Sequence, residues 1–292
     1  MKSNKKLVPP CSYQGGKQRL AKQIVDVIFE QNEINEETKF YDLCCGSGAI
    51  SLELINRGIY PWNITMVDKS PWGLFWEKVG DLTFSMDVFE VYINDIPKDI
   101  AKIKDYAKKM LEQPANDGLL DNMVYKFLIL QACAFGGTAT WAENNRWEKA
   151  GGLRNYWLPT ETSNRKSPVN PMMPMPNTLY ERVEDILANT DGIKGKCCDA
   201  NDIIIEKNSI VYIDPPYKCT QDYGFDFDYM SYINKYKNIS KIYLSEGYKI
   251  DNANSSILLS KGRTKGNING NAKKKPVEEW LNIYFKKIKG DE

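Results

Sequence analysis

Residues 39–56 read KFYDLCCGSGAISLELIN, and this stretch decides the fold. The short apolar run at 39–45 is typical of a buried strand, and the glycine-containing turn at 46–48 ends it. Helical spacing of apolar residues resumes at 49–56. A strand, a glycine turn and a helix in this order open a βαβ unit, so we expect an α/β protein with a parallel sheet.

Three further predicted strands lead into acidic residues. The strands at 63–67, near 193–198 and at 209–213 are followed by Asp68, Asp199 and Asp214. Asp68 lies about 20 residues beyond the glycine turn, where open α/β nucleotide sites usually place a carboxylate for ribose hydroxyls. Because ligands of open parallel sheets bind at the carboxyl ends of the strands, we expect the three acids to share one crevice.

Residues 87–176 depart from the alternation of strands and helices. Helices are predicted at 99–111 and 119–134, and 135–176 then mixes Gly, Asn, Arg, Trp and Pro without a helical or strand period. Loops of such length are usually functional or disordered, and the aromatic and methionine content argues against plain disorder. We interpret the segment as an inserted recognition segment, and regular alternation returns with a helix at 178–188.

The composition excludes several kinds of chemistry. The chain of 292 residues has no histidine, so it has no imidazole base, no Ser-His-Asp triad and no His-ligated metal. The seven cysteines fit neither a disulfide framework nor zinc-site spacing, and we interpret them as small buried hydrophobic residues. No apolar stretch approaches the roughly 20 residues of a membrane span, and residues 1–6 lead into no signal-peptide core, so we expect a cytoplasmic protein without membrane contact.

Positive charge is clustered, although the net charge is only +1. One cluster lies at 261–275, and a second lies in the insert, where it includes Lys149. A solvated surface is one interpretation of each cluster, and contact with phosphates is the other. The second interpretation selects six residues: Arg146, Arg154, Arg165, Lys166, Lys273 and Lys274.

The tetrapeptide Asp214-Pro215-Pro216-Tyr217 follows the predicted strand at 209–213 directly. A strand-ending turn is its simplest interpretation, because Asp and Pro are ordinary turn formers. The chemical alternative is an acceptor clamp, since prolines donate no N–H and leave rigidly directed carbonyl oxygens beside the carboxylate. Such a clamp suits an aromatic amine that must present its N–H bonds while its nitrogen attacks, with Tyr217 stacked on the ring. Methyl transfer to the exocyclic amine of a nucleobase fits this description.

With these motifs in view, the chain resembles the Dam-like, alpha-group DNA adenine N6-methyltransferases. Five features carry the resemblance: YQGGK at 13–17, DLCCGSG at 42–48, Asp68, Asp199 and the tetrapeptide at 214–217. Cofactor motifs come first, a recognition insert next and the catalytic tetrapeptide last, which is the alpha-group order; residues 267–284 also resemble that family's C-terminal segment.

The resemblance implies a Rossmann-like, S-adenosylmethionine-dependent methyltransferase fold. A catalytic, cofactor-binding domain would comprise residues 1–86 and 177–292, and a mainly helical and irregular target-recognition domain would comprise 87–176. Cofactor contacts fall on eight residues: Tyr13, Lys17, Asp42, Gly46, Gly48, Asp68, Asp199 and Asp214. Tyr13 and Lys17 would contact the methionine portion, the glycines would let the backbone approach, Asp68 would hold the ribose hydroxyls and Asp199 the adenine edge.

The implied reaction is transfer of a methyl group to N6 of an adenine flipped out of double-stranded DNA. The Asp214 carboxylate and the Pro215 carbonyl would accept from the target amine, and Tyr217 would stack on the base; no metal and no obligatory protein partner are implied. One departure is Cys44, which stands where the family often has Phe. Three of these residues also have a purely structural interpretation. Lys17 could be a surface lysine, Asp199 a turn former, and Asp42 a loop or helix-capping acceptor.

Three other functions compete with this one. An RNA or other nucleic-acid amino-methyltransferase would use a similar tetrapeptide, although the insert favours DNA. A catalytically silent DNA-binding protein could keep the fold, but the intact tetrapeptide and Lys17 argue against it. A dinucleotide oxidoreductase needs a third glycine, and Gly46-Ser47-Gly48 is followed instead by Ala49-Ile50-Ser51.

Overall fold

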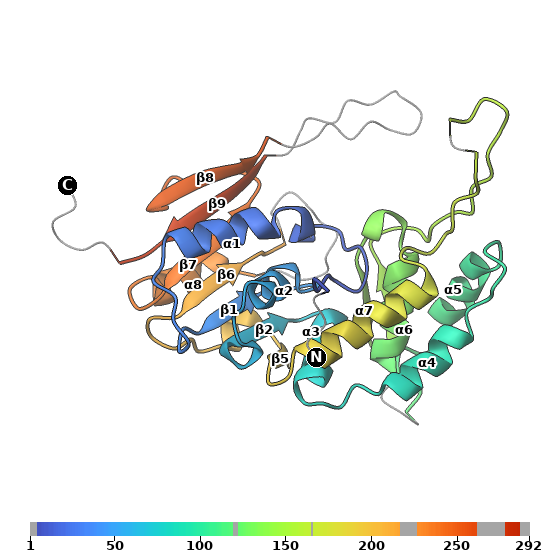
Figure 1. Ribbon diagram of the computed structural model, residues 1–292, viewed down its shortest axis with the longest axis horizontal. Coiled ribbons are helices and arrows are strands. Elements are labelled where there is room, and N and C mark those ends of the chain that lie inside the picture. The colour runs from blue at the N-terminus through green and yellow to red at the C-terminus, as the bar shows by residue number, and fades with distance from the viewer. Residues whose placement is uncertain (1–4, 119–121, 165, 217–226, 262–277, 287–292) are drawn as a thin grey trace.

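The computed structural model describes residues 5–118, 122–164, 166–216, 227–261 and 278–286. A seven-stranded mixed sheet forms its centre (Figure 1). The sheet contains, in spatial order, β5 (Lys194–Cys197), β2 (Ile64–Asp68), β1 (Phe40–Leu43), β6 (Ile210–Ile213), β7 (Lys241–Glu246), β9 (Glu279–Tyr284) and β8 (Ser255–Ser260). The strands from β5 to β7 are parallel, and β9 runs antiparallel to both of its neighbours. The chain is therefore an α/β protein, as predicted.

The order of the strands locates the place where a ligand would bind. From β1 the chain moves outward through β2 to β5, and it then returns to the other side of β1 with β6 and β7. The direction of winding thus reverses between β1 and β6. In open α/β sheets, ligands bind at such a switch point, outside the carboxyl ends of the strands.

Alternating side chains of the strands form two cores on the two faces of the sheet. Phe40 and Met66 belong to one cluster with helices α1 (Ala21–Glu30), α2 (Ala49–Asn56) and α3 (Pro71–Gly80). Tyr41 and Leu43 belong to the other, with α8 (Tyr229–Tyr236). Because successive strand residues point to opposite faces, a strand covered on both sides reads as a continuous apolar run, which is how β6 appears in the sequence, and β1 departs from it only at the buried Asp42.

The region predicted as an insert is built mainly of helices. It contains α4 (Met86–Asn94), α5 (Ile103–Glu112) and α6 (Met123–Cys133), and α7 (Pro176–Asn189) follows it; Figure 1 shows these helices gathered beside the sheet, away from β8 and β9. The expectation that 135–176 has no strand period is wrong in one place. Strands β3 (Thr140–Glu143) and β4 (Arg146–Lys149) form an antiparallel hairpin. Its two-residue turn consists of Asn144 and Asn145, at φ +49° and +60°, a conformation that Asn tolerates better than most residues.

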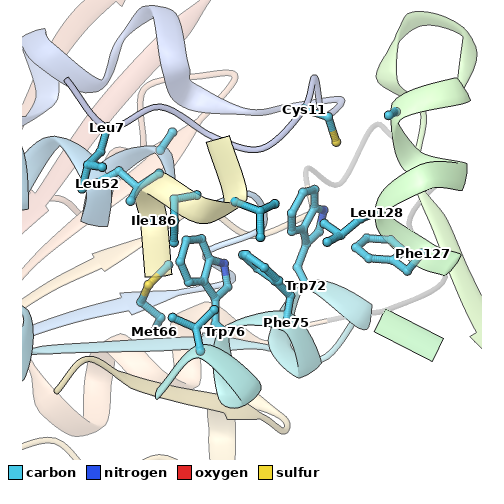
Figure 2. Packing of buried hydrophobic residues seen from close by; sticks show 14 of the residues in the cluster. Leu7, Cys11, Leu52, Met66, Trp72, Phe75, Trp76, Phe127, Leu128 and Ile186 are labelled. Atoms are coloured by element: carbon cyan, nitrogen blue, oxygen red, sulfur yellow. The ribbon is translucent and has the colours of Figure 1, made fainter. Parts of the chain in front are cut away.

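The helices of the insert share a core with the sheet. The Trp72 ring on α3 meets Phe127 on α6 edge-on, with ring centroids 5.0 Å apart, and contacts Phe75 at 6.2 Å (Figure 2). Phe89 on α4 stacks on Tyr180 of α7 at 6.2 Å. The predicted domain boundaries, after 86 and after 176, fall inside α4 and α7, so this continuous packing rather than a linker joins the two parts of the chain.

The cysteines are only partly buried, and none forms a disulfide among the described residues. Cys11 and Cys133 are buried as predicted, but Cys197 is exposed because β5 is an edge strand of the sheet; all six cysteines in the described ranges are free. Among the described residues, no helix is long and apolar enough to cross a membrane.

Candidate active site

The candidate site centres on Lys17 and Asp214, at the switch point of the sheet. Lys17 belongs to a single turn of 3-10 helix, η1 (Lys17–Arg19), and its side chain is only 6% exposed. Its Nζ lies 2.6 Å from Asp214 Oδ1, 3.0 Å from the Gly15 carbonyl and 3.5 Å from Glu279 Oε1. A buried ammonium is stable only when it is paired and hydrogen-bonded, so these contacts explain why Lys17 is not the surface lysine of the structural alternative.

Asp214 directly follows the last residue of β6, at the carboxyl edge of the sheet. Its backbone N–H donates to the Leu43 carbonyl at 3.2 Å, which fixes it against the end of β1. Pro215 is buried and Pro216 is half-buried, while Tyr217 lies outside the described residues. Burial raises the pKa of Asp214 to about 6; the Lys17 charge opposes this rise, and the charges of Glu279 and Glu246 add to it. The carboxylate is therefore mostly ionised at neutral pH and able to accept hydrogen bonds.

Glu246 and Glu279 are two acids of the site that sequence reasoning missed. Glu246 ends β7 and is buried, with Oε2 accepting from the Tyr229 hydroxyl at 3.2 Å and Oε1 from the Gly247 N–H at 2.9 Å. The rule that identified Asp68 and Asp214, an acid at the end of an apolar strand, applies equally to Glu246, and the run at 241–246 was the signal. Glu279 begins an antiparallel strand, so that rule would not have found it.

The glycine turn after β1 holds Tyr13 and Asp68 in place. The Gly46 N–H donates to Asp68 Oδ2 at 2.7 Å, and the Gly46 carbonyl accepts from Trp76 Nε1 at 2.9 Å. A Cβ at Gly46 would lie 3.0 Å from Cε1 of the Tyr13 ring, so this ring packs against the glycine. The YQGGK segment and the carboxylate that ends β2 thus meet at Gly46.

Gly48 is required for internal packing. Its φ is +79°, and a Cβ would come within 2.2 Å of Trp76 Cζ2. The lack of a side chain at Gly48 therefore lets the Trp76 indole ring pack against the backbone. The predicted cofactor contact of Gly48 stays a prediction.

Asp42, Asp68 and Asp199 are all held by hydrogen bonds. The buried Asp42 carboxylate accepts from the hydroxyl of Ser51 at 2.7 Å and from its N–H at 3.3 Å, so it caps the first turn of α2, which is the structural alternative for this residue. Burial raises the pKa of Asp42 to about 7. Asp68 Oδ1 accepts from the Ser70 N–H at 2.8 Å, and burial raises its pKa.

Asp199 lies half-buried two residues beyond β5. Its Oδ1 accepts from the Asn201 N–H at 3.0 Å, and its Oδ2 pairs with Lys69 at 3.0 Å. The hydrogen bond from Asn201 is the main cause of the lowered pKa of Asp199, and Lys69 contributes as well. This geometry is that of a turn former, and it leaves the carboxylate charged at the edge of the sheet.

The structure brings the predicted acids to one edge of the sheet. They lie at or just beyond the ends of β5, β2, β1 and β6, which are consecutive neighbours. Cys44 lies among them at φ +60°. Burial raises the pKa of its thiol well above the ordinary value, and the nearby charges of Asp68, Asp214, Asp42 and Asp199 raise it further. The acids thus lie along one edge of the sheet, and the shared crevice stays a prediction.

The predicted phosphate contacts have different surroundings. Arg146 on β4 and Lys166 are exposed. Arg154 is half-buried: its Nε is buried without a hydrogen-bond partner among the described residues, and burial lowers its pKa. An exposed phosphate is therefore a poor partner for that part of Arg154. Arg165, Lys273 and Lys274 lie outside the described residues.

No known protein-family model matches the chain, and no curated protein matches it significantly. The fold and the site define it as an α/β protein whose mainly parallel sheet carries, among the described residues, a cluster of acids and a buried lysine at its carboxyl edge.

Proposed function

We propose that this protein is a site-specific DNA adenine methyltransferase that uses S-adenosylmethionine. The single observation that carries the proposal is the position of Asp214-Pro215-Pro216: it follows β6 at the switch point, and Asp214 pairs there with the lysine of the YQGGK segment. Two motifs that define the resemblance, nearly two hundred residues apart, thus meet in one site.

The residues at the end of β6 supply acceptors for an amine. The two prolines have no N–H, so the chain presents carbonyl oxygens and the Asp214 carboxylate there without a competing backbone donor. An exocyclic amine that gives its two N–H bonds to such acceptors keeps its nitrogen lone pair directed away from them. Asp214 and the Pro215 carbonyl would hold N6 of adenine in this way.

The charges of the site fit the cofactor. S-adenosylmethionine, when bound, supplies an electrophilic methyl group on a cationic sulfonium. Asp214 and Glu279 both lie within 4 Å of the Lys17 ammonium, and Glu246 adds a third negative charge nearby, so among the described residues the site has an excess of negative charge that favours a cationic ligand. Asp68 and Asp199 lie at the ends of neighbouring strands and would accept from the ribose hydroxyls and from the adenine edge.

The insert would provide DNA recognition. Arg146 on strand β4 and Lys166 in the irregular segment that follows it are both exposed there. Flipping an adenine costs a few kcal/mol, which contacts with the phosphates and the flanking bases would offset.

A methyl-transfer assay tests the proposal. Purified protein would be incubated with tritiated S-adenosylmethionine in three parallel reactions, which contain duplex DNA, single-stranded DNA or RNA as the acceptor. We expect label in N6-methyladenine of duplex DNA for the wild type, and none above background for Asp214→Asn, which preserves the shape of the side chain. Label found only in RNA would support the RNA alternative, and DNA binding without label would support the silent DNA-binding protein.

A further inference from the structure

Glu279 reaches the candidate site from the C-terminal part of the chain. It is the first residue of β9, and its side chain is 16% exposed. Because β9 is antiparallel to β7, its beginning lies beside the end of β7, as the pairing of Glu246 with Trp280 shows. An acid at the start of this strand therefore reaches the same edge as the acids that end the parallel strands.

The ammonium of Lys17 lies between two carboxylates that come from different strands. Nζ is 2.6 Å from Asp214 Oδ1 and 3.5 Å from Glu279 Oε1, and the Gly15 carbonyl accepts from it at 3.0 Å. A lysine ammonium has three N–H donors, and these three acceptors are enough to fix its orientation. Without Glu279, the flexible four-carbon chain of Lys17 would have more freedom around the Asp214 carboxylate.

We propose that Glu279 is a positioning residue: it holds Lys17 so that the ammonium meets Asp214 Oδ1 and leaves the remaining acceptor capacity of that carboxylate for the substrate amine. This inference rests on the proposed function, since it assigns Glu279 a part in that site. Glu279 acts through Lys17 and needs no contact with the substrate.

The charges around Asp214 determine how the loss of Glu279 would appear. Lys17 lowers the pKa of Asp214, while Glu279 and Glu246 raise it; among the described residues, Asp42, Cys44 and Tyr212 are further titratable groups in its surroundings. Without the Glu279 charge, the Lys17 ammonium has more orientational freedom, but Asp214 and the Gly15 carbonyl still keep its charge beside Asp214, so the pKa of Asp214 falls. The acidic limb of the pH–rate profile should then move to lower pH, which a purely structural defect would not cause.

The test compares Glu279→Gln with Glu279→Asp and with Glu278→Gln, whose glutamate is exposed and adjacent in sequence. For Glu279→Gln we expect kcat to fall at least about fivefold, with KM for DNA nearly unchanged, and the acidic limb to move down by about half a pH unit. Glu279→Asp should keep the limb at its wild-type position because it keeps the charge, and Glu278→Gln should match the wild type throughout. An unmoved limb in Glu279→Gln would overturn the inference.

A double-mutant cycle keeps the inference testable even if the wild type transfers no methyl group, which would refute the proposed function. Denaturant midpoints would be measured for Lys17→Met, Glu279→Gln and the double variant. We expect the two changes to be non-additive, with Glu279→Gln destabilising the wild type more than it destabilises Lys17→Met. Additive midpoints would show that Glu279 does not hold Lys17.

Discussion

Lys17 Nζ and Asp214 Oδ1 lie 2.6 Å apart, although 197 residues separate the two in the chain. The contact joins the N-terminal YQGGK segment to the end of β6 and closes the site across the switch point. We propose that the lysine keeps the half-buried carboxylate charged, and that this carboxylate is the acceptor on which the reaction depends.

The rate of methyl transfer should depend on the ionisation of Asp214. Its pKa is raised to about 6, and the protonated form is a poor acceptor for an amine. We therefore expect the single-turnover rate to fall about tenfold per pH unit below this value. Lys17→Met removes the charge that lowers this pKa, so the acidic limb of the pH–rate profile should move to higher pH. The control is Lys22→Met, at an exposed position of α1, which should leave the acidic limb in place. A rate that stays constant down to pH 5 would contradict the assigned role.

Asp42 should make the folded protein more stable as the pH falls. Its pKa is about 7 in the folded protein and 3.8 as the ordinary value, so the folded state binds an extra proton between these limits. The free energy of unfolding should therefore rise by up to about 1.4 kcal/mol for each pH unit lowered within this window. Asp42→Asn should remove that contribution, while Asp81→Asn, an exposed control, should not. Urea titrations at pH 5 and pH 7.5 would measure the change in unfolding free energy between the two pH values. An equal change in the wild type and in Asp42→Asn would refute the prediction.

Gly48→Ala should destabilise the fold. A left-handed backbone costs a non-glycine residue about 1–3 kcal/mol, and overpacking against Trp76, 2.2 Å from the new Cβ, costs a similar amount. Gly58→Ala is the matched control, because Gly58 also has a positive φ, +94°, but nothing lies within 4 Å of its Cβ position. The larger loss of unfolding free energy should be at Gly48. If both variants lost the same amount, the contact with Trp76 would not be the reason for glycine.

Arg146 and Lys166 should contribute to DNA binding through phosphates. Changing either one to Gln should weaken binding to all sequences alike and reduce the slope of log K against log salt concentration by about one. Lys207→Gln is the control. Lys207 is exposed and lies just before β6, at the amino ends of the parallel strands and thus at the end of the sheet opposite the candidate site. A salt slope that does not change in the Arg146 and Lys166 variants would exclude phosphate contact at these positions.

The sequence predicted the parts of the fold that short-range patterns determine. The strand, turn and helix at 39–56 are present as β1, the glycine turn and α2, and the strand-end acids lie along one edge of the sheet. The hairpin of β3 and β4 was missed because the irregular surroundings hid a two-residue Asn turn. Helix α3 was missed although Ser70, whose side chain accepts from the Trp72 N–H, and Pro71 are typical of a helix start.

Other features depend on contacts that no local pattern determines. Glu279 reaches the site only because β9 inserts antiparallel between β7 and β8. Arg154 was predicted to contact phosphate, but its Nε is buried, and the adjacent Leu153 pairs with Ala134 at the end of α6. Such long-range pairings are set by the packing of the whole chain.

The most direct test of the central claim is the methylation state of DNA from cells that express the protein and lack adenine methylation of their own. Modified-base sequencing of that DNA would report activity, target base and recognition sequence together. We predict N6-methyladenine within one short recurring sequence for the wild type, and none for Asp214→Asn expressed at the same level. DNA without N6-methyladenine in wild-type cells, or with equal methylation in Asp214→Asn cells, would contradict the account.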